Sequence, residues 1–191
     1  MLAFNRERRR FTPEEYLRLE ETSEFRSEFH DGEIFAMTGG SVNHDRIIAN
    51  LRQALDARFA DGSCRTYGSD VKLLVERHML FTYPDLTVAC GGVPLLKGRN
   101  DTLIDAKLLI EVLSPSTESY DRGEKFRLYQ ALPSFLEYVL IAQDKTLVER
   151  YLRSGDAWDW KGYVSIDDTL ELESVSVAIP LGLIYRNLPV S

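Results

Sequence analysis

The stretch KLLIEVL, residues 107–113, decides the fold, because it is a nearly continuous run of apolar residues. Such a run is typical of a central β-strand that is covered on both faces. The segment Ser114-Pro115-Ser116 ends the strand. Glu111 is the only acid in this otherwise apolar strand, and this makes it the first candidate for a functional residue.

A carboxylate in such a strand needs compensation, since burying an ionised acid without a partner costs several kcal/mol. A divalent cation could compensate Glu111, and so could a buried arginine or lysine. The residue alone does not decide between the two.

Asp85 is a second acid of this kind, in the predicted strand LFTYPDLTVAC (80–90). Its neighbour Pro84 indicates a bulge or the rim of a sheet, where side chains are turned toward a site. If Asp85 and Glu111 converge on one face, their repulsion is relieved by a hard cation, and a set of oxygen ligands favours Mg²⁺ or Mn²⁺ over zinc. The alternative is two unrelated acids, each paired separately.

Other elements follow from periodicity and end signals. After residue 113 we expect a helix at about 120–131, a buried strand at 137–142, a strand at about 146–152 and peripheral strands or loops. Before it we expect a helix from Thr12-Pro13 to about Glu21, a hairpin in FRSEFHDGEIFAM (25–37) turning at Asp31-Gly32, a helix capped by Asn43 that runs to about residue 60, and a strand at about 65–76. The whole, residues 1–191, is predicted to be one α/β domain.

The helix after Glu111 contains DRGEKFRLY (121–129). Lys125 and Tyr129 are four residues apart and share a helix face, and Arg122 lies on the same side. A lysine beside a carboxylate–metal site could position the attacking water or stabilise the transition state. The alternative is a solvated helix surface on which Asp121 pairs with Lys125.

Three further residues are weaker candidates. His44, in the first turn of its helix, could bind a phosphate or metal-bound water, or be an ordinary capping residue. Glu28, in the hairpin, could contact the metal directly or through another group, or be a solvated acid. Asp70 is expected to lie in water.

The composition restricts the function. A net charge of −7 argues against a non-specific nucleic-acid coat protein, but a carboxylate metal site is compatible with it. Cys64 and Cys90 are far apart and predict neither a zinc site nor a disulfide, so a reducing, cytoplasmic location is expected. No apolar run is long enough to span a bilayer, and no signal peptide is recognisable.

The chain resembles the Uma family (DUF820) of restriction-endonuclease-like proteins, within the PD-(D/E)xK nuclease superfamily. The resemblance covers about Thr12 to Tyr151, with a weaker echo in PLGLIY (180–185). The stretches that carry it are EFHDGEIFAMTG (28–39), NHDRI (43–47), YPDLTVAC (83–90), LLIEVLSPSTESYDRGEKFRLY (108–129) and EYVLI (137–141).

The resemblance implies an α-β-β-β-α-β core around a mixed sheet and metal-dependent cleavage of DNA. Asp85 and Glu111 match the two motif acids, which would bind Mg²⁺ or Mn²⁺ together with the carbonyl of Val112. Glu28 and His44 match family positions as well. In the superfamily pattern a lysine stands two residues after the second acid, but this chain has Leu113 there. The family shares this departure. Its lysine lies on the next helix, where Lys125 matches it.

The sequence therefore predicts a metal-dependent endodeoxyribonuclease that hydrolyses phosphodiesters by in-line attack of an activated water. Two alternatives remain: a nuclease fold without catalysis that binds nucleic acid or protein, and a hydrolase of small phosphoesters. DNA is the expected substrate, and a homodimer formed through a sheet edge or the hairpin is plausible.

Overall fold

The computed structural model describes residues 9–37 and 39–188. In chain order, its first half contains α1 (Pro13–Thr22), β1 (Ser27–His30), β2 (Glu33–Ala36), α2 (Val42–Arg58), β3 (Cys64–Gly68), β4 (Lys72–Val75), η1 (Glu76–His78), β5 (Leu80–Thr82), β6 (Leu86–Cys90) and β7 (Thr102–Leu103). The second half contains β8 (Leu108–Leu113), α3 (Glu118–Tyr120), η2 (Asp121–Lys125), α4 (Phe126–Tyr129), β9 (Glu137–Ala142), β10 (Val148–Ser154), β11 (Ala157–Tyr163), β12 (Thr169–Leu172), η3 (Glu173–Val175), β13 (Val177–Pro180) and α5 (Leu181–Ile184).

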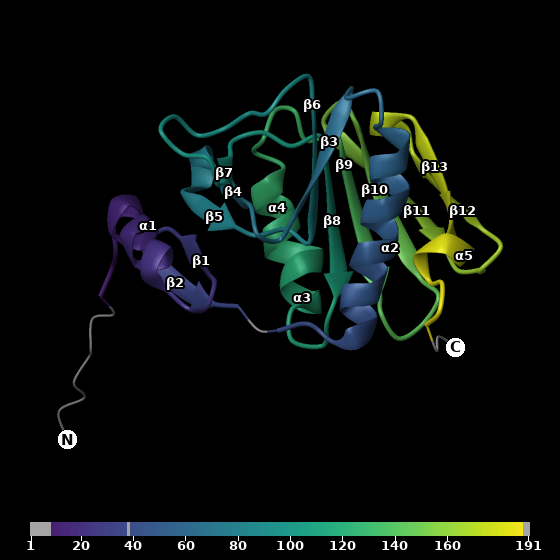
Figure 1. Cartoon of the computed structure of the whole chain (residues 1–191), viewed down its shortest axis with the longest axis horizontal. Coiled ribbons are helices and arrows are strands. Elements are labelled where there is room, and N and C mark those ends of the chain that lie inside the picture. Colours follow the sequence, from purple (N-terminus) through teal and green to yellow (C-terminus); the bar gives the residue numbers. More distant parts are fainter. Residues whose placement is uncertain (1–8, 38, 189–191) are drawn as a thin grey trace.

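Two sheets organise the molecule (Figure 1). The central sheet has the order β11-β10-β9-β8-β6-β3, in which β8 and β9 are parallel and the other neighbours antiparallel. The hairpin sheet has the order β2-β1-β5-β4-β7 and lies with α1 on the left of the view. The strands β12 and β13 form a separate hairpin beside the central sheet.

Strand β8 lies inside the central sheet, and both of its faces are covered. Leu108, Ile110 and Val112 pack in the cluster that contains α2 and the C-terminal elements β12, β13 and α5. Leu109 and Leu113 pack in the cluster that contains α4. The alternation of side chains along a strand therefore directs Glu111, between Leu109 and Leu113, to the face covered by α3, η2 and α4.

The N-terminal predictions are confirmed. Thr12 caps α1 in a capping box with Glu15, whose carboxylate in turn accepts a hydrogen bond from the Thr12 amide. The β1–β2 hairpin turns at Asp31 and Gly32, which both have positive φ, 43° and 88°. A two-residue turn of this kind matches the twist of the flanking strands. Phe29, on one face of the hairpin, packs on Tyr16 of α1.

The helix predicted after the hairpin begins earlier than expected. Its cap is Ser41, whose Oγ accepts a hydrogen bond from the amide of His44, and Asn43 lies inside the first turn. Asn43 instead donates through its side chain to the carbonyl of Gln143. The helix ends at Arg58, close to the predicted end at about residue 60, and Gly62 follows with φ 78°.

Two predicted strands are each divided in two. The segment 65–76 breaks after Gly68, so that β3 belongs to the central sheet and β4 to the hairpin sheet. The segment 80–90 breaks at Tyr83-Pro84-Asp85, again between β5 in the hairpin sheet and β6 in the central sheet. Both faces of β4 are covered, so Lys72 is buried and paired with Asp101 rather than solvated. Alternation of apolar residues cannot reveal such a change of sheet, because it looks the same in both strands.

The helix predicted at about 120–131 begins and ends two residues earlier than expected. It runs from Glu118 to Tyr129 through α3, a π-helical turn (η2) and α4. The interpretation of the cysteines is wrong: Cys64 and Cys90 face one another in the register of β3 and β6 and form a disulfide. Residues that are 26 positions apart become neighbours only when the two strands pair. Within the described residues, no helix is long and apolar enough to cross a membrane.

Candidate active site

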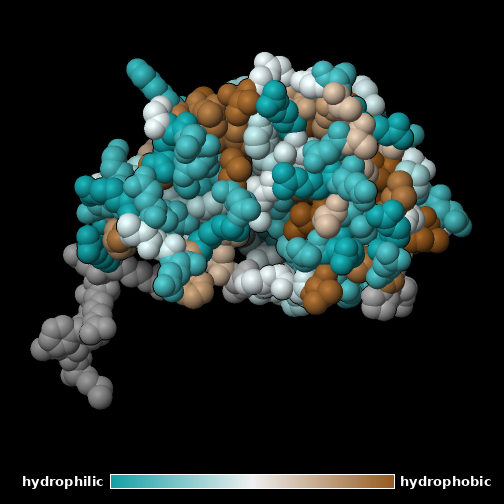
Figure 2. All heavy atoms as spheres, viewed as in Figure 1, coloured by the Kyte–Doolittle hydropathy of each residue, from teal (hydrophilic) through white to brown (hydrophobic). Residues whose placement is uncertain are grey.

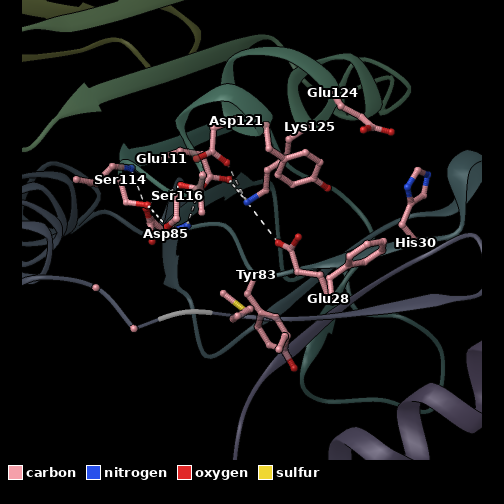
Figure 3. A pocket seen from close by; sticks show the side chains of 18 of the residues that line it. Glu28, His30, Tyr83, Asp85, Glu111, Ser114, Ser116, Asp121, Glu124 and Lys125 are labelled. Atoms are coloured by element: carbon pink, nitrogen blue, oxygen red, sulfur yellow. Dashed lines mark hydrogen bonds and ion pairs between the residues drawn. The ribbon is translucent and has the colours of Figure 1, made fainter.

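The candidate site lies where the two sheets diverge. There the β1–β2 hairpin and the segment around η2 enclose a cleft of about 670 Å³ (Figure 3). Glu28 and Lys125 point toward one another in its middle, with Asp85 and Ser114 toward one end. His30 and Glu124 flank the other end. All five predicted site side chains line this cleft: Glu28, His44, Asp85, Glu111 and Lys125.

Asp85 and Glu111 are tied together through the main chain. Oδ2 of Asp85 accepts a hydrogen bond of 2.7 Å from the amide of Val112, the residue after Glu111. The amide of Asp85 donates in return to Oε2 of Glu111 at 3.3 Å. Since Asp85 follows Pro84 at the crossover between sheets, the break in the strand aims its carboxylate at the end of β8. The convergence of the two acids is therefore present in the structure.

Lys125 is buried among three carboxylates. Its Nζ lies 3.0 Å from Glu111 Oε1, 3.4 Å from Glu28 Oε1 and 3.6 Å from Asp121 Oδ1. The predicted pairing with Asp121 thus occurs, but in the interior rather than on a solvated surface, because both residues are buried. Lys125 reaches the acids from the helical segment that follows β8. The position two residues after Glu111, where the superfamily pattern has its lysine, is occupied by the apolar Leu113.

The π-helical turn aligns the polar side chains of this helix. In an α-helix, residues at i, i+4 and i+8 rotate by about 40° at each step, because one turn takes 3.6 residues. The wider turn at Asp121–Lys125 reduces this drift. Asp121, Lys125 and Tyr129 then share one face, and the hydroxyl of Tyr129 donates to Glu111 Oε1 at 2.9 Å.

The site carries an excess of negative charge. Burial raises the pKa of Glu111 to about 8; Lys125 opposes this rise, and the carboxylates of Asp121 and Asp85 add to it. Burial likewise raises the pKa of Asp121. For Lys125, burial alone would lower the pKa, but Glu111 and the other acids hold it well above the usual value. One lysine is thus not sufficient to satisfy the acids around it.

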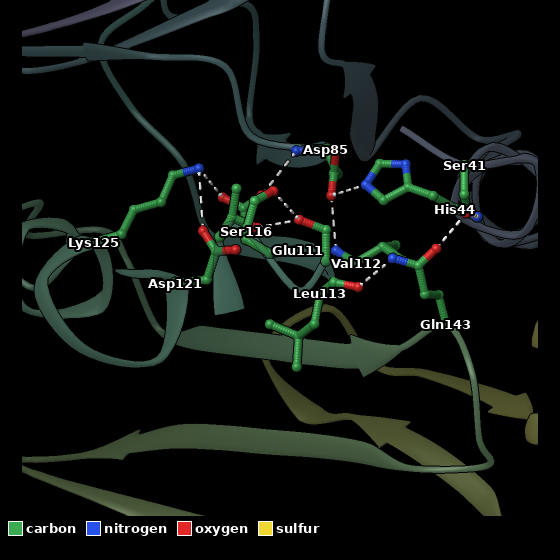
Figure 4. A network of polar contacts seen from close by, with 12 residues as sticks. Ser41, His44, Asp85, Glu111, Val112, Leu113, Ser116, Asp121, Lys125 and Gln143 are labelled. Carbon is green, nitrogen blue, oxygen red and sulfur yellow. Dashed lines mark hydrogen bonds and ion pairs between the residues drawn. The ribbon is translucent and has the colours of Figure 1, made fainter. Parts of the chain in front are cut away.

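His44 is oriented toward Asp85. Its Nε2 lies 3.2 Å from Asp85 Oδ2, and the imidazole also interacts with the main chain of Val112 (Figure 4). Burial lowers the pKa of His44, but Asp85 outweighs this and the net direction is upward. The histidine therefore supports an acid of the site, an arrangement that the sequence interpretation did not include.

Two residues that the sequence did not single out hold His44 in place. Gln143, after β9, donates to the carbonyl of Leu113 at 2.7 Å and is hydrogen-bonded to Ser41, the cap of α2. It ties the start of α2 to the end of β8. Gly40 packs against the imidazole, since a Cβ at this position would lie 2.7 Å from His44 Nδ1.

Other predicted residues lie elsewhere or have a different role. Arg122 does not line the cleft and pairs with Glu118 and Glu149. Asp70 is exposed, as expected, and pairs with Arg26. Asp121 was considered only as a partner of Lys125, yet it is a buried acid of the site. Its position four residues before Lys125 was the signal available in the sequence.

Two Synechocystis proteins are similar in sequence to this chain. A Synechocystis protein named "Uncharacterized protein slr1290" is 36% identical over 181 residues, which cover 94% of this chain and 93% of that protein. A second Synechocystis protein, "Uncharacterized protein sll1609", is 34% identical over 145 residues, covering 76% of this chain and 82% of its own length.

A solved structure has the same fold. It is described as a "putative nuclease belonging to DUF820" from Anabaena variabilis and superposes with a TM-score of 0.75. The match covers 92% of this chain and 97% of the other, at 16% identity. The predicted restriction-endonuclease-like fold is therefore confirmed. The model of the Uma2 family, described as "Putative restriction endonuclease", matches residues 13–183. The chain belongs to the Uma2 family of restriction-endonuclease-like proteins.

Proposed function

We propose that the protein is a divalent-metal-dependent endonuclease that hydrolyses DNA phosphodiesters at the Asp85–Glu111 pair. The observation that carries the proposal is the convergence of the two acids in one cleft: the Asp85 amide donates to Glu111, the Asp85 carboxylate accepts from the amide of Val112, and Lys125 lies 3.0 Å from Glu111 Oε1. Family membership supports a nuclease, and the site supplies the residues that such chemistry needs.

The donor set fits a magnesium or manganese ion. Asp85, Glu111 and the carbonyl of Val112 provide hard oxygen ligands, which Mg²⁺ and Mn²⁺ prefer. Among the described residues, no group of three or more His, Cys, Asp and Glu side chains could hold a metal ion. The proposal therefore gives the cation two carboxylates; Mg²⁺ typically binds one or two and completes its shell with water and substrate phosphate oxygens. A bound cation would also offset the excess of negative charge around Glu111.

The residues then have separate roles. Asp85 and Glu111, with Val112, would hold the cation, which when bound activates water and neutralises charge on the scissile phosphate. Lys125 presents its ammonium group to the negative charge that develops on the phosphate in the transition state. Glu28 and Asp121 position Lys125 between them, and His44 orients the carboxylate of Asp85.

Plasmid nicking tests the proposal. The wild-type protein should nick supercoiled DNA with Mg²⁺ or Mn²⁺ and lose this activity with EDTA. Asp85→Asn should abolish nicking while the protein keeps its circular-dichroism spectrum. Equal nicking by the wild type and Asp85→Asn would contradict the proposal, because the activity would then come from another site or a contaminant.

Calorimetric titration with Mn²⁺ distinguishes an active nuclease from a nuclease fold that only binds other molecules. The wild type should bind Mn²⁺, and Glu111→Gln should bind it much more weakly, since one of two acidic ligands is lost. If the wild type binds no Mn²⁺ at millimolar concentration, the alternative of a nuclease fold without catalysis is favoured.

A further inference from the structure

The face of the β1–β2 hairpin that borders the cleft carries an exposed aromatic ring. In the register of the hairpin, Phe35 stands opposite Glu28. Opposite residues of an antiparallel pair project from the same face, so Phe35 lies on the side from which Glu28 reaches Lys125. Phe35 lines the cleft and is 47% exposed.

The hairpin has an apolar core on its other face, so packing does not require Phe35 to be aromatic. Phe29 on that face is 1% exposed and packs on Tyr16 and Phe81. A second ring, that of Tyr120 at the start of the helical segment, lines the cleft from the side of Lys125, whose Nζ lies 5.9 Å from the ring centroid. Aromatic rings thus stand on two walls beside the acids.

The reactive groups lie at the bottom of this cleft. Glu111 is 3% exposed and Lys125 is 6% exposed, so a phosphodiester must enter the recess to reach them. A volume of about 670 Å³ is that of a cleft which encloses a single small ligand. A DNA duplex is stiff over about 150 base pairs and keeps its backbone on the outside of a rod. An unpaired strand bends and can insert one nucleotide.

The charges of the cleft also favour stacking over phosphate contacts. The basic side chains among its described lining residues are Arg10, His30, His44 and Lys125. Arg10 is paired with Asp31, His44 with Asp85, and Lys125 with three acids. Because these basic groups are paired with acids, binding through many ionic contacts with the DNA backbone is not supported. On the face shown in Figure 2, the region of α1 and the hairpin is largely hydrophilic.

We infer that the cleft binds unpaired DNA and that one nucleobase stacks on Phe35 while the adjoining phosphodiester reaches Glu111 and Lys125. This inference rests on the proposed function and specifies its substrate as single-stranded DNA, a flap or a locally open duplex. Stacking on an aromatic ring is tolerant of sequence and contributes about 1–3 kcal/mol per base. The hairpin is then the wall that selects unpaired nucleotides.

Fluorescence anisotropy tests the inference without requiring cleavage. A labelled single-stranded oligodeoxynucleotide and a duplex of the same length are titrated with the full chain in the presence of Ca²⁺, and strand integrity is checked on a denaturing gel. The single strand should bind more tightly than the duplex. Because few phosphates are contacted, binding should depend only weakly on salt. A plot of the logarithm of the association constant against the logarithm of the salt concentration should have a slope between 0 and about −2.

Variants of Phe35 provide the decisive comparison. Phe35→Ala should weaken single-strand binding about 5- to 150-fold, the range that corresponds to the loss of one stacked base, and Phe35→Trp should retain it. Phe25→Ala is the matched control, because Phe25 is 77% exposed and does not line the cleft. Phe35 is half exposed, so its replacement is expected to leave folding intact, which thermal unfolding will verify.

The outcomes separate this inference from the proposed function. Unchanged binding by Phe35→Ala, or tighter binding of the duplex than of the single strand, overturns the inference even if the protein cuts DNA. Phe35-dependent binding of single strands by a protein that cuts no DNA supports the inference and refutes the proposed function.

Discussion

Two buried glutamates in adjacent parallel strands have opposite surroundings. Glu137 opens β9 and is fully buried; its carboxylate accepts hydrogen bonds from the amides of Glu173 and Ser174 and from the Ser174 hydroxyl, and Arg150 lies 3.7 Å away. Glu111, near the end of β8, has the amide of Asp85, the hydroxyl of Tyr129 and Lys125, but two further acids stand beside it.

The comparison shows that burial of an acid does not by itself indicate a functional site. Burial raises the pKa of both carboxyl groups. Glu137 is compensated by donors of the η3 turn and fastens the C-terminal hairpin to the central sheet. Glu111 is surrounded by more acids than cations and faces a cleft. The inventory of neighbouring charges, together with access to solvent, distinguishes the two.

The largest expected effect comes from exchanging the two glutamates for glutamine. Glu111→Gln should abolish nicking with little loss of stability, because it removes one charge from an acidic cluster. Glu137→Gln should retain nicking but lower the free energy of unfolding by about 1–3 kcal/mol, since it weakens bonds to a charged acceptor. Plasmid nicking and urea unfolding measure both. Similar losses of activity in the two variants would remove the distinction.

Lys125→Met tests the role of the lysine ammonium that lies beside Glu111. Nicking should fall about 100-fold or more if the ammonium stabilises the transition state. Mn²⁺ affinity, measured by calorimetry, should stay equal or increase, because a positive charge leaves the neighbourhood of the ligands. The control is Lys72→Met, another buried lysine, whose partner Asp101 lies outside the cleft. Weaker Mn²⁺ binding in Lys125→Met alone would assign this lysine to the ordering of the ligands instead.

Gly40→Ala tests the orientation of His44. The added Cβ would lie 2.7 Å from Nδ1 and push the imidazole away from Asp85. We expect Mn²⁺ affinity to fall about tenfold, as for other groups that orient metal ligands. Gly39→Ala is the matched control, because a Cβ there meets nothing within 4 Å and its affinity should stay that of the wild type. Indistinguishable affinities would show that His44 does not support the ligands.

The smallest effect on activity is expected at the disulfide. Replacing Cys64 by serine removes a cross-link between residues 26 positions apart, at the end of β6 away from Asp85. The free energy of unfolding should fall by about 3 kcal/mol, with nicking of the folded protein unchanged. If nicking were lost while the protein stayed folded, this end of the central sheet would influence the site around Asp85 and Glu111, contrary to the prediction.

Much of the site was accessible from the sequence. Asp85, Glu111 and Lys125 were singled out because charged residues in apolar strands, or on the helix that follows one, need a partner. Glu28 and His44 are only weak candidates from their places in the hairpin and the first helix turn, and the resemblance adds that both match family positions. Glu137 shows the limit of this reasoning: it also opens an apolar strand, yet its partners come from Ser174 and Arg150, which no local pattern connects with it.

The sequence by itself determined the order of elements, the buried strand β8 and the types of residue available for chemistry, because these depend on local periodicity and on the cost of burying charge. Only the tertiary structure decided which residues meet. The chain changes sheet at the crossovers after Gly68 and at Pro84. The Cys64–Cys90 bond and the hydrogen bond between Ser41 and Gln143 join segments that are distant in the chain. Such contacts are fixed by packing between elements, which a pattern along one element does not contain.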